Sequence, residues 1–117
     1  MSVQEIFFTQ FDEFLTALIE MYPDDTDFVL LQTSVNGFYY VTPKYVIQTF
    51  YDSIKPYEEH VLAKNESFFL DNTFEEADMN ILSKLQSYVR GMSPATKKHV
   101  WQYLHNLLRL AKASLSQ

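Results

Sequence analysis

Glycine is scarce in this chain, and that scarcity restricts the folds open to it. The 117 residues include two glycines and four prolines, which is little material for the tight turns that join the strands of a large sheet. Apolar residues make up 47% of the chain, too many for an intrinsically disordered protein. A chain of this length can bury enough apolar surface for one hydrophobic core. We therefore predict a helical fold.

Apolar side chains recur at three- and four-residue spacing in several segments, as in amphipathic helices. Three of these helices have a start signal: a capping box at Ser2–Glu5, and a capping hydroxyl before proline at Thr42-Pro43 and at Ser93-Pro94. The predicted buried stripes are Phe7, Phe11, Phe14, Leu15, Leu18, Ile19 and Tyr22 in the first helix, Val46, Ile47, Phe50, Tyr51 and Ile54 in the third, and Val100, Trp101, Leu104, Leu107, Leu108, Ala111 and Leu115 in the last.

The middle of the chain leaves alternatives open. A second helix starts near Asp25 and runs to about Tyr40, unless Asn36-Gly37 ends it early. Pro56 either kinks the third helix or starts a short fourth one. Residues 65–74 are predicted as a loop, and a further helix follows from the acids at 75–78 to Gly91. The prediction is an all-α protein, a single compact domain over residues 1–117 with five or six amphipathic helices.

Charge is divided unevenly along the chain. The first 78 residues carry three cations and all fifteen acids, a net charge of −12, and the last 39 carry six cations and no acid. Together these give the −6 of the whole chain. Such asymmetry favours a charged partner or an assembly contact.

The charged residues of the first and last helices lie opposite their apolar stripes. The acidic face is Glu5, Asp12, Glu13 and Glu20, and the basic face is Lys98, His105, Arg109 and Lys112. If both stripes face one core, both charged faces meet solvent and cannot neutralise each other within one molecule. We therefore predict a protein partner or head-to-tail self-association. Five tyrosines are candidate contact residues, although most of them are expected to line the core: Tyr39, Tyr40, Tyr45, Tyr57 and Tyr103.

The sequence contains no recognised catalytic or metal-binding motif. Cysteine is absent, and two glycines leave no phosphate-binding loop or nucleophile elbow. The three histidines lack the spacing of a helical metal site, and the acids around Asp25 lack the order of an EF-hand loop. We predict a non-enzymatic protein without catalytic residues, metal, cofactor or small-molecule substrate. An enzyme would need an unfamiliar constellation of residues.

No apolar run approaches the roughly 18 residues needed to span a bilayer, and no signal peptide is evident. We expect no membrane partner. The alternative partner is nucleic acid, because Lys98, Arg109 and Lys112 share one face of the last helix and could contact phosphates. The acidic charge of the whole chain weighs against this alternative.

Several stretches resemble a family of small helical proteins found in large double-stranded DNA viruses of algae and other protists. They include Tyr-Pro-Asp-Asp-Thr-Asp after an apolar helix end, Val-Thr-Pro-Lys, Lys-Pro-Tyr-Glu-Glu-His-Val-Leu and Met-Ser-Pro before the last helix. The stretches lie in the same order as in the family, at residues 14–27, 41–44, 55–62, 65–70 and 92–104.

The resemblance implies a viral origin and an all-α fold, and it carries over no catalytic or binding residue. We therefore predict a viral protein that acts through protein–protein contacts, such as a minor component of the virion or of the assembly site. Its predicted location is the host cell cytoplasm or the virion. The alternative is a small nucleic-acid-binding accessory protein that uses the basic last helix.

Overall fold

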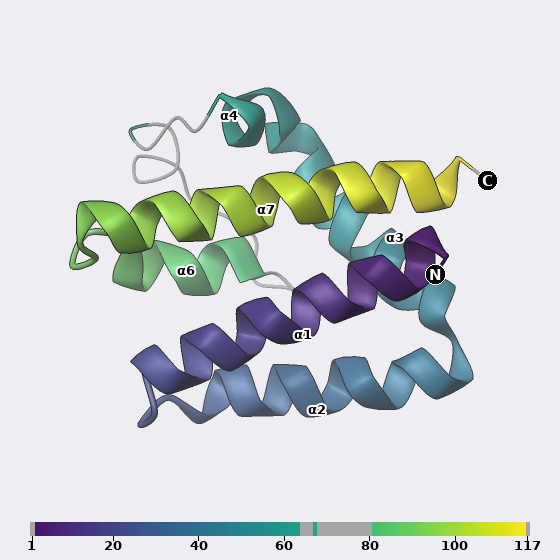
Figure 1. Ribbon diagram of the computed structural model, residues 1–117, viewed down its shortest axis with the longest axis horizontal. Coiled ribbons are helices and arrows are strands. Elements are labelled where there is room, and N and C mark those ends of the chain that lie inside the picture. Colours follow the sequence, from purple (N-terminus) through teal and green to yellow (C-terminus); the bar gives the residue numbers. More distant parts are fainter. Residues whose placement is uncertain (1, 64–66, 68–80, 117) are drawn as a thin grey trace.

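A computed structural model describes residues 2–63, 67 and 81–116 of the protein. Their helices are α1 (Val3–Met21), α2 (Thr26–Val41), α3 (Pro43–Ile54), the 3-10 turn η1 (Lys55–Tyr57), α4 (Glu58–Leu62), α6 (Ile81–Val89) and α7 (Pro94–Leu115). Figure 1 shows the arrangement of these helices. Regular structure in the described ranges is entirely helical, which confirms the predicted all-α fold. The predicted loop at 65–74, Ser67 apart, and the acids at 75–78 lie outside the described residues.

Two helices begin as their sequences predict. The Ser2 side chain accepts a hydrogen bond from the Glu5 backbone N–H at 3.1 Å, and its hydroxyl donates to Glu5 Oε1 at 3.2 Å. The Ser93 hydroxyl accepts from the Thr96 backbone N–H at 3.2 Å. Each cap satisfies a backbone donor that has no partner inside its helix. These contacts fix the starts of α1 and α7.

The start of α3 differs from the prediction in one respect. Thr42 occupies the N-cap position, but its side chain makes no capping hydrogen bond. Its backbone N–H instead donates to the Phe38 carbonyl at 2.7 Å and closes the last turn of α2. Pro43 still sets the first helical position, because its ring fixes φ near the helical value. The proline, rather than the threonine hydroxyl, therefore defines this start.

The open alternatives in the middle of the chain are now resolved. Helix α2 continues through Gly37 to Val41, so the early end at Asn36-Gly37 is wrong. A glycine inside a helix lowers its stability without breaking it, and Phe28 and Val35 anchor α2 on either side of its centre. Pro56 lies in the 3-10 turn that separates α3 from the short α4. The second of the two Pro56 alternatives is therefore correct.

The core lies where α1, α3 and α7 meet. Phe7, Phe11 and Phe50 pack edge to face, with ring centroids 5.4 to 5.7 Å apart. Phe14 stacks on Tyr103 of α7 at 5.0 Å. The predicted stripes are buried apart from four partly buried members: Ile19, Tyr22, Tyr51 and Leu115.

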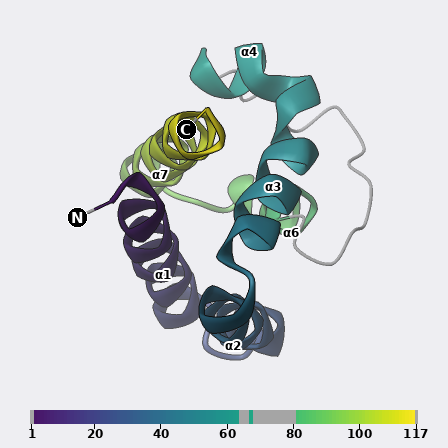
Figure 2. The same cartoon turned by 90° about the vertical axis from the view of Figure 1, so that its right-hand side faces the viewer.

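The helices surround this core unequally. Helix α7 runs across the molecule and packs against α1, α3 and α4, and α1 lies between α7 and α2 (Figure 1). Helix α2 packs against α1 and α3 and occupies one edge of the molecule (Figure 2). Because its contacts come from one side, the opposite side of α2 faces outward.

Candidate interaction surfaces

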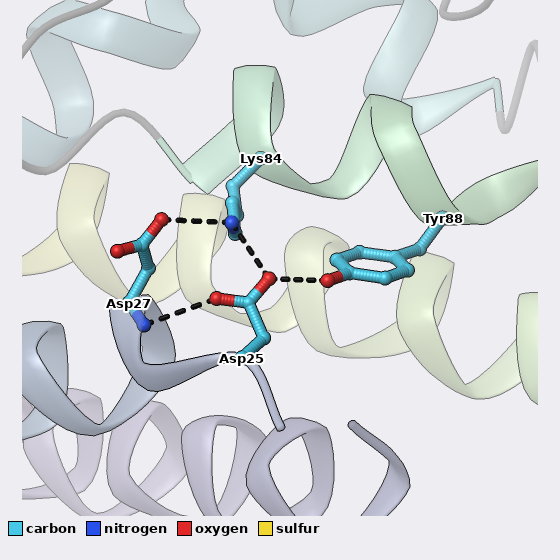
Figure 3. A network of polar contacts seen from close by, with 4 residues as sticks. All are labelled: Asp25, Asp27, Lys84 and Tyr88. Atoms are coloured by element: carbon cyan, nitrogen blue, oxygen red, sulfur yellow. Dashed lines mark hydrogen bonds and ion pairs between the residues drawn. The ribbon is translucent and has the colours of Figure 1, made fainter. Parts of the chain in front are cut away.

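A polar cluster joins α6 to the turn between α1 and α2 (Figure 3). Lys84 Nζ of α6 lies 2.6 Å from Asp25 Oδ2 and 2.8 Å from Asp27 Oδ2. The Tyr88 hydroxyl donates a hydrogen bond to Asp25 Oδ2. Asp25 also caps α2 by accepting from the Asp27 backbone N–H at 3.0 Å. One carboxylate thus both starts α2 and fastens it to α6.

The protonation states in this cluster are set by its contacts. Burial alone would raise the pKa of Asp25, but hydrogen bonds from Lys84, Tyr88 and the Asp27 amide, with the lysine charge, lower it below its ordinary value. Burial would lower the pKa of Lys84, but its bonds and charge interactions with both aspartates raise it. The hydrogen bond to Asp25 raises the pKa of Tyr88, and burial adds to that effect. At neutral pH Asp25 and Lys84 are therefore charged and the Tyr88 phenol is protonated.

Aromatic packing completes the cluster. Tyr88 stacks on Tyr22 with ring centroids 4.0 Å apart, and Lys84 Nζ lies 5.7 Å from the centre of the Phe28 ring. We interpret this group as a clamp that holds three helices together, and call it the Asp25–Lys84 clamp.

Three members of the predicted basic face line a cleft of about 400 Å³ between α4 and α7. They are His105, Arg109 and Lys112, and Glu58 lies across from them. Lys112 Nζ is 2.6 Å from Glu58 Oε1, and the hydrogen bond with Glu58 raises the pKa of Lys112. Lys98 is exposed two helical turns away and does not line the cleft.

The predicted acidic face on α1 is exposed, as expected from its pattern: Glu5, Asp12, Glu13 and Glu20 all face solvent. Within the described residues these acids make no ion pair with α7. The cations of the second half instead meet other acids of the first half, through Lys84 with Asp25 and Asp27 and through Lys112 with Glu58. The two predicted faces therefore do not neutralise each other within the described residues, and Lys112 of the basic face pairs instead with Glu58, an acid outside the predicted acidic face.

Most of the large apolar side chains that are exposed in the described residues lie on α2 and the start of α3. We call this area the outer surface of α2, and it consists of Val29, Leu30, Phe38, Tyr40, Val41 and Tyr45. Leu30 is 63% exposed, and Tyr40 and Val41 are 84% and 82% exposed. The Phe38 and Tyr45 rings lie 5.3 Å apart across the corner between the two helices. Among the candidate tyrosines, Tyr40 and Tyr45 are exposed, whereas Tyr39, Tyr57 and Tyr103 pack partly against the core.

Sequence reasoning missed this surface, although one signal for it is present. No charged residue occurs between Asp27 and Lys44, a run of 16 residues. Apolar side chains fall on every side of that run, so its pattern predicts a helix without showing which side is covered. An uncharged segment of this length is unusual for an exposed helix and identifies α2 as a candidate interaction helix.

The described residues offer no site for a metal ion. No three histidine, aspartate or glutamate side chains come close enough there to hold one. In the same ranges, no helix combines the length and the apolar character required to cross a bilayer.

No family model, curated protein or solved structure matches this chain. The viral resemblance and the functional predictions therefore stay predictions.

Proposed function

We propose that this chain is a non-enzymatic protein that acts through protein–protein contacts, with the outer surface of α2 as its main contact surface. One observation supports this most: six of the eight large apolar side chains exposed in the described part of the chain lie on that surface. Apolar side chains gathered in one exposed area mark interaction sites in soluble proteins. Tyrosine, present here as Tyr40 and Tyr45, is enriched in such sites.

The fold itself gains little from these side chains. Leu30, Tyr40 and Val41 remain mostly in water, so their apolar surface contributes little to the hydrophobic stabilisation of the monomer. Neighbouring residues hold the surface in place from behind, because Phe28 and Val35 are buried and Tyr39 packs on Phe8 with ring centroids 4.7 Å apart. A rigid helix therefore presents apolar side chains that a partner could bury.

The resemblance to small helical proteins of large DNA viruses provides the biological context of the proposal. In that context the contacts would form in a virion or at an assembly site in the host cytoplasm. Short, rigid helical modules suit such roles because little conformational entropy is lost when they bind.

Site-specific cross-linking in cells tests the proposal. A photoreactive amino acid at Val41 should capture a discrete protein, because Val41 lies within the proposed contact surface. The same group at Ser87, which is exposed on α6, is the matched control and should capture far less. Equal capture at both positions, or none at Val41, would contradict the proposed surface.

Nucleic-acid binding along α7 is the weaker alternative. Lys98 and Arg109 are exposed and make no ion pair within the described residues. Lys112, however, forms an ion pair with Glu58, whose carboxylate brings negative charge into the cleft. A phosphate backbone there would meet that carboxylate. The alternative would replace our proposal if labelled DNA or RNA bound tightly at low salt and lost affinity in a Lys98→Gln, Arg109→Gln variant.

A further inference from the structure

Four residues form a straight stripe along the exposed side of α2. Leu30, Ser34, Gly37 and Val41 are spaced by four, three and four positions, and all four are exposed. At 100° per residue this spacing keeps them within about 60° of one another around the helix axis. The same geometry places them opposite Phe28 and Val35, the two buried residues of α2. We call these four residues the α2 stripe.

The order of large and small side chains along the α2 stripe is the same in both directions. A large residue is followed by two small ones and then by a second large one, with the midpoint between Val35 and Asn36. If a second α2 lies antiparallel across this midpoint, Leu30 of each copy meets Val41 of the other, and Ser34 meets Gly37. The spacing of alternating three and four residues is also that of helices packed side by side.

Gly37 has no explanation within a single chain. It lies inside a helix, where glycine costs about 1 kcal/mol relative to alanine. Apart from its chain neighbours and the adjacent backbone of its own helix, nothing lies within 4 Å of the place where its Cβ would be, and its backbone is not in the left-handed region. A glycine is needed, however, where a second backbone comes very close. The small Ser34 beside it on the stripe fits the same close approach.

Charges at the two ends of α2 also fit a second copy. Asp27 lies in the first turn of α2, where it also pairs with Lys84, and Lys44 lies in the first turn of α3, just beyond the C-terminal end of α2; both are exposed. An antiparallel pair brings the acidic N-terminal end of one α2 near Lys44 of the other copy, at both ends of the pair. The uncharged stretch between them places no like charges opposite each other, although each chain carries a net charge of −6.

We propose that two copies of this chain pair through the α2 stripe, antiparallel about a two-fold axis between Val35 and Asn36. The inference rests on the proposed function and names a second copy as the partner. A closed two-fold pair is the commonest form of self-association.

The area that two α2 helices can bury against each other indicates a weak dimer. A helix of 16 residues is about 24 Å long and roughly 10 Å across. A pair of such helices buries on the order of 1,000 Å² or less in total, the range of weak complexes. The dimer should therefore form with a dissociation constant on the order of tens of micromolar.

Sedimentation equilibrium over a wide concentration range tests the pairing. The wild-type chain should shift from monomer to dimer, and a Gly37→Leu variant should weaken the dimer by about tenfold or more, because the leucine holds the two backbones apart. The monomer has open space at Gly37, so the variant should fold normally, which circular dichroism checks. Asn36→Leu is the matched control, because Asn36 is exposed on α2 but lies off the stripe. Unchanged or stronger association of Gly37→Leu would overturn the inference.

Cysteine cross-linking tests the antiparallel register, since the chain has no native cysteine. In the proposed pair the two Leu30 positions are about 16 Å apart along the helix axes, too far for a disulfide. Leu30→Cys and Val41→Cys variants should therefore cross-link when mixed and fail to do so alone. Rapid cross-linking of Leu30→Cys by itself would overturn the antiparallel arrangement.

The two proposals fail in different ways. A wild-type chain that stays monomeric at all concentrations would overturn the dimer. If the photoreactive group at Val41 then captured a different protein, the proposed function would stand with another partner. If the photoreactive group at Val41 captured no protein, both the dimer and the proposed function would be overturned.

Discussion

Helices α1 and α2 are neighbours of similar length that the fold uses in different ways. Helix α1 has six buried side chains, and its outer side carries acids. Helix α2 has two buried side chains, and beyond Asp27 in its first turn the outer side carries only uncharged residues, most of them apolar or small. The apolar residues of α1 are accounted for by the core, whereas most of those of α2 are not. The contrast shows that α2 is covered on one side only by its own chain, and under the proposed function a partner covers the other side.

Alanine substitutions at one apolar residue in each helix should give the largest difference. Phe11 of α1 is fully buried, so Phe11→Ala should lower the free energy of unfolding by about 3–5 kcal/mol. Leu30→Ala on α2 should change it by less than about 0.5 kcal/mol. Urea unfolding of dilute protein measures both values. Similar losses at the two positions would remove the contrast between the helices.

The attachment of α2 to the rest of the molecule should give the next largest effect. Asparagine caps a helix as well as aspartate does, so Asp25→Asn keeps the cap and removes the charge of the Asp25–Lys84 clamp. We expect a loss of about 1 kcal/mol, limited by solvent screening of the partly exposed lysine. Asp24→Asn changes an exposed neighbour and should have little effect. Equal stability of the two variants in urea would show that the clamp does not hold α2.

The stabilisation by this clamp should depend on pH in a defined way. The pKa of Asp25 is lowered in the fold, so its contribution is complete above the ordinary value of 3.8 and is lost as the pH falls below it. The pKa of Lys84 is raised, so its contribution is complete below the ordinary value of 10.5 and is lost as the pH rises above it. The difference in stability between wild type and Asp25→Asn should be constant between these limits and shrink outside them. Thermal unfolding across this pH range measures the difference, and a change near neutral pH would contradict the assignment.

A gain in stability is expected at Gly37. Gly37→Ala should raise the free energy of unfolding by up to about 1 kcal/mol, because the new methyl group meets no atom of the same chain. Urea unfolding of dilute protein measures the gain, because the chain is then monomeric and association does not contribute to its stability. A loss of stability would mean that Gly37 has a role within the chain, and the argument for a second backbone at this position would fail.

Neutralising the charged faces should have the smallest effect. A chain with Arg109→Gln and Lys112→Gln, or with Glu13→Gln and Glu20→Gln, should self-associate as the wild type does. These residues lie on α7 and α1, away from the α2 stripe. Sedimentation at low and high salt compares the variants. Dissociation of the dimer by either pair of substitutions would instead favour head-to-tail contact between the acidic and basic faces.

Local rules predict the helices of this chain well. The caps at Ser2 and Ser93 and the stripes through Phe7 and Leu104 follow from side chains a few residues apart, and the structure confirms them. The break at Pro56 is also local, although its outcome depended on how α3 and α4 pack against α7. Hydrophobic spacing and capping chemistry were sufficient for these features because each acts within one or two helical turns.

The surfaces depend on packing between distant segments and were harder to predict. Lys84 and Asp25 are 59 residues apart, and nothing in their local patterns connects them. On α2, apolar residues at Phe28, Val35 and Phe38 gave the expected helix, but Phe38 is exposed. A helix that is apolar all round has no pattern to show which side the rest of the chain will cover.

The packing of α1 against α7 has a consequence for synthesis of the chain. The buried side of α1 includes four phenylalanines, and it is completely covered only after α7, which ends 94 residues beyond the end of α1 (115 − 21), has left the ribosome. At about 5 to 20 residues per second, that interval lasts on the order of five to twenty seconds. During that time the apolar side of α1 is an exposed target for chaperones. The synthesis of α7 therefore controls when the nascent protein can complete this core.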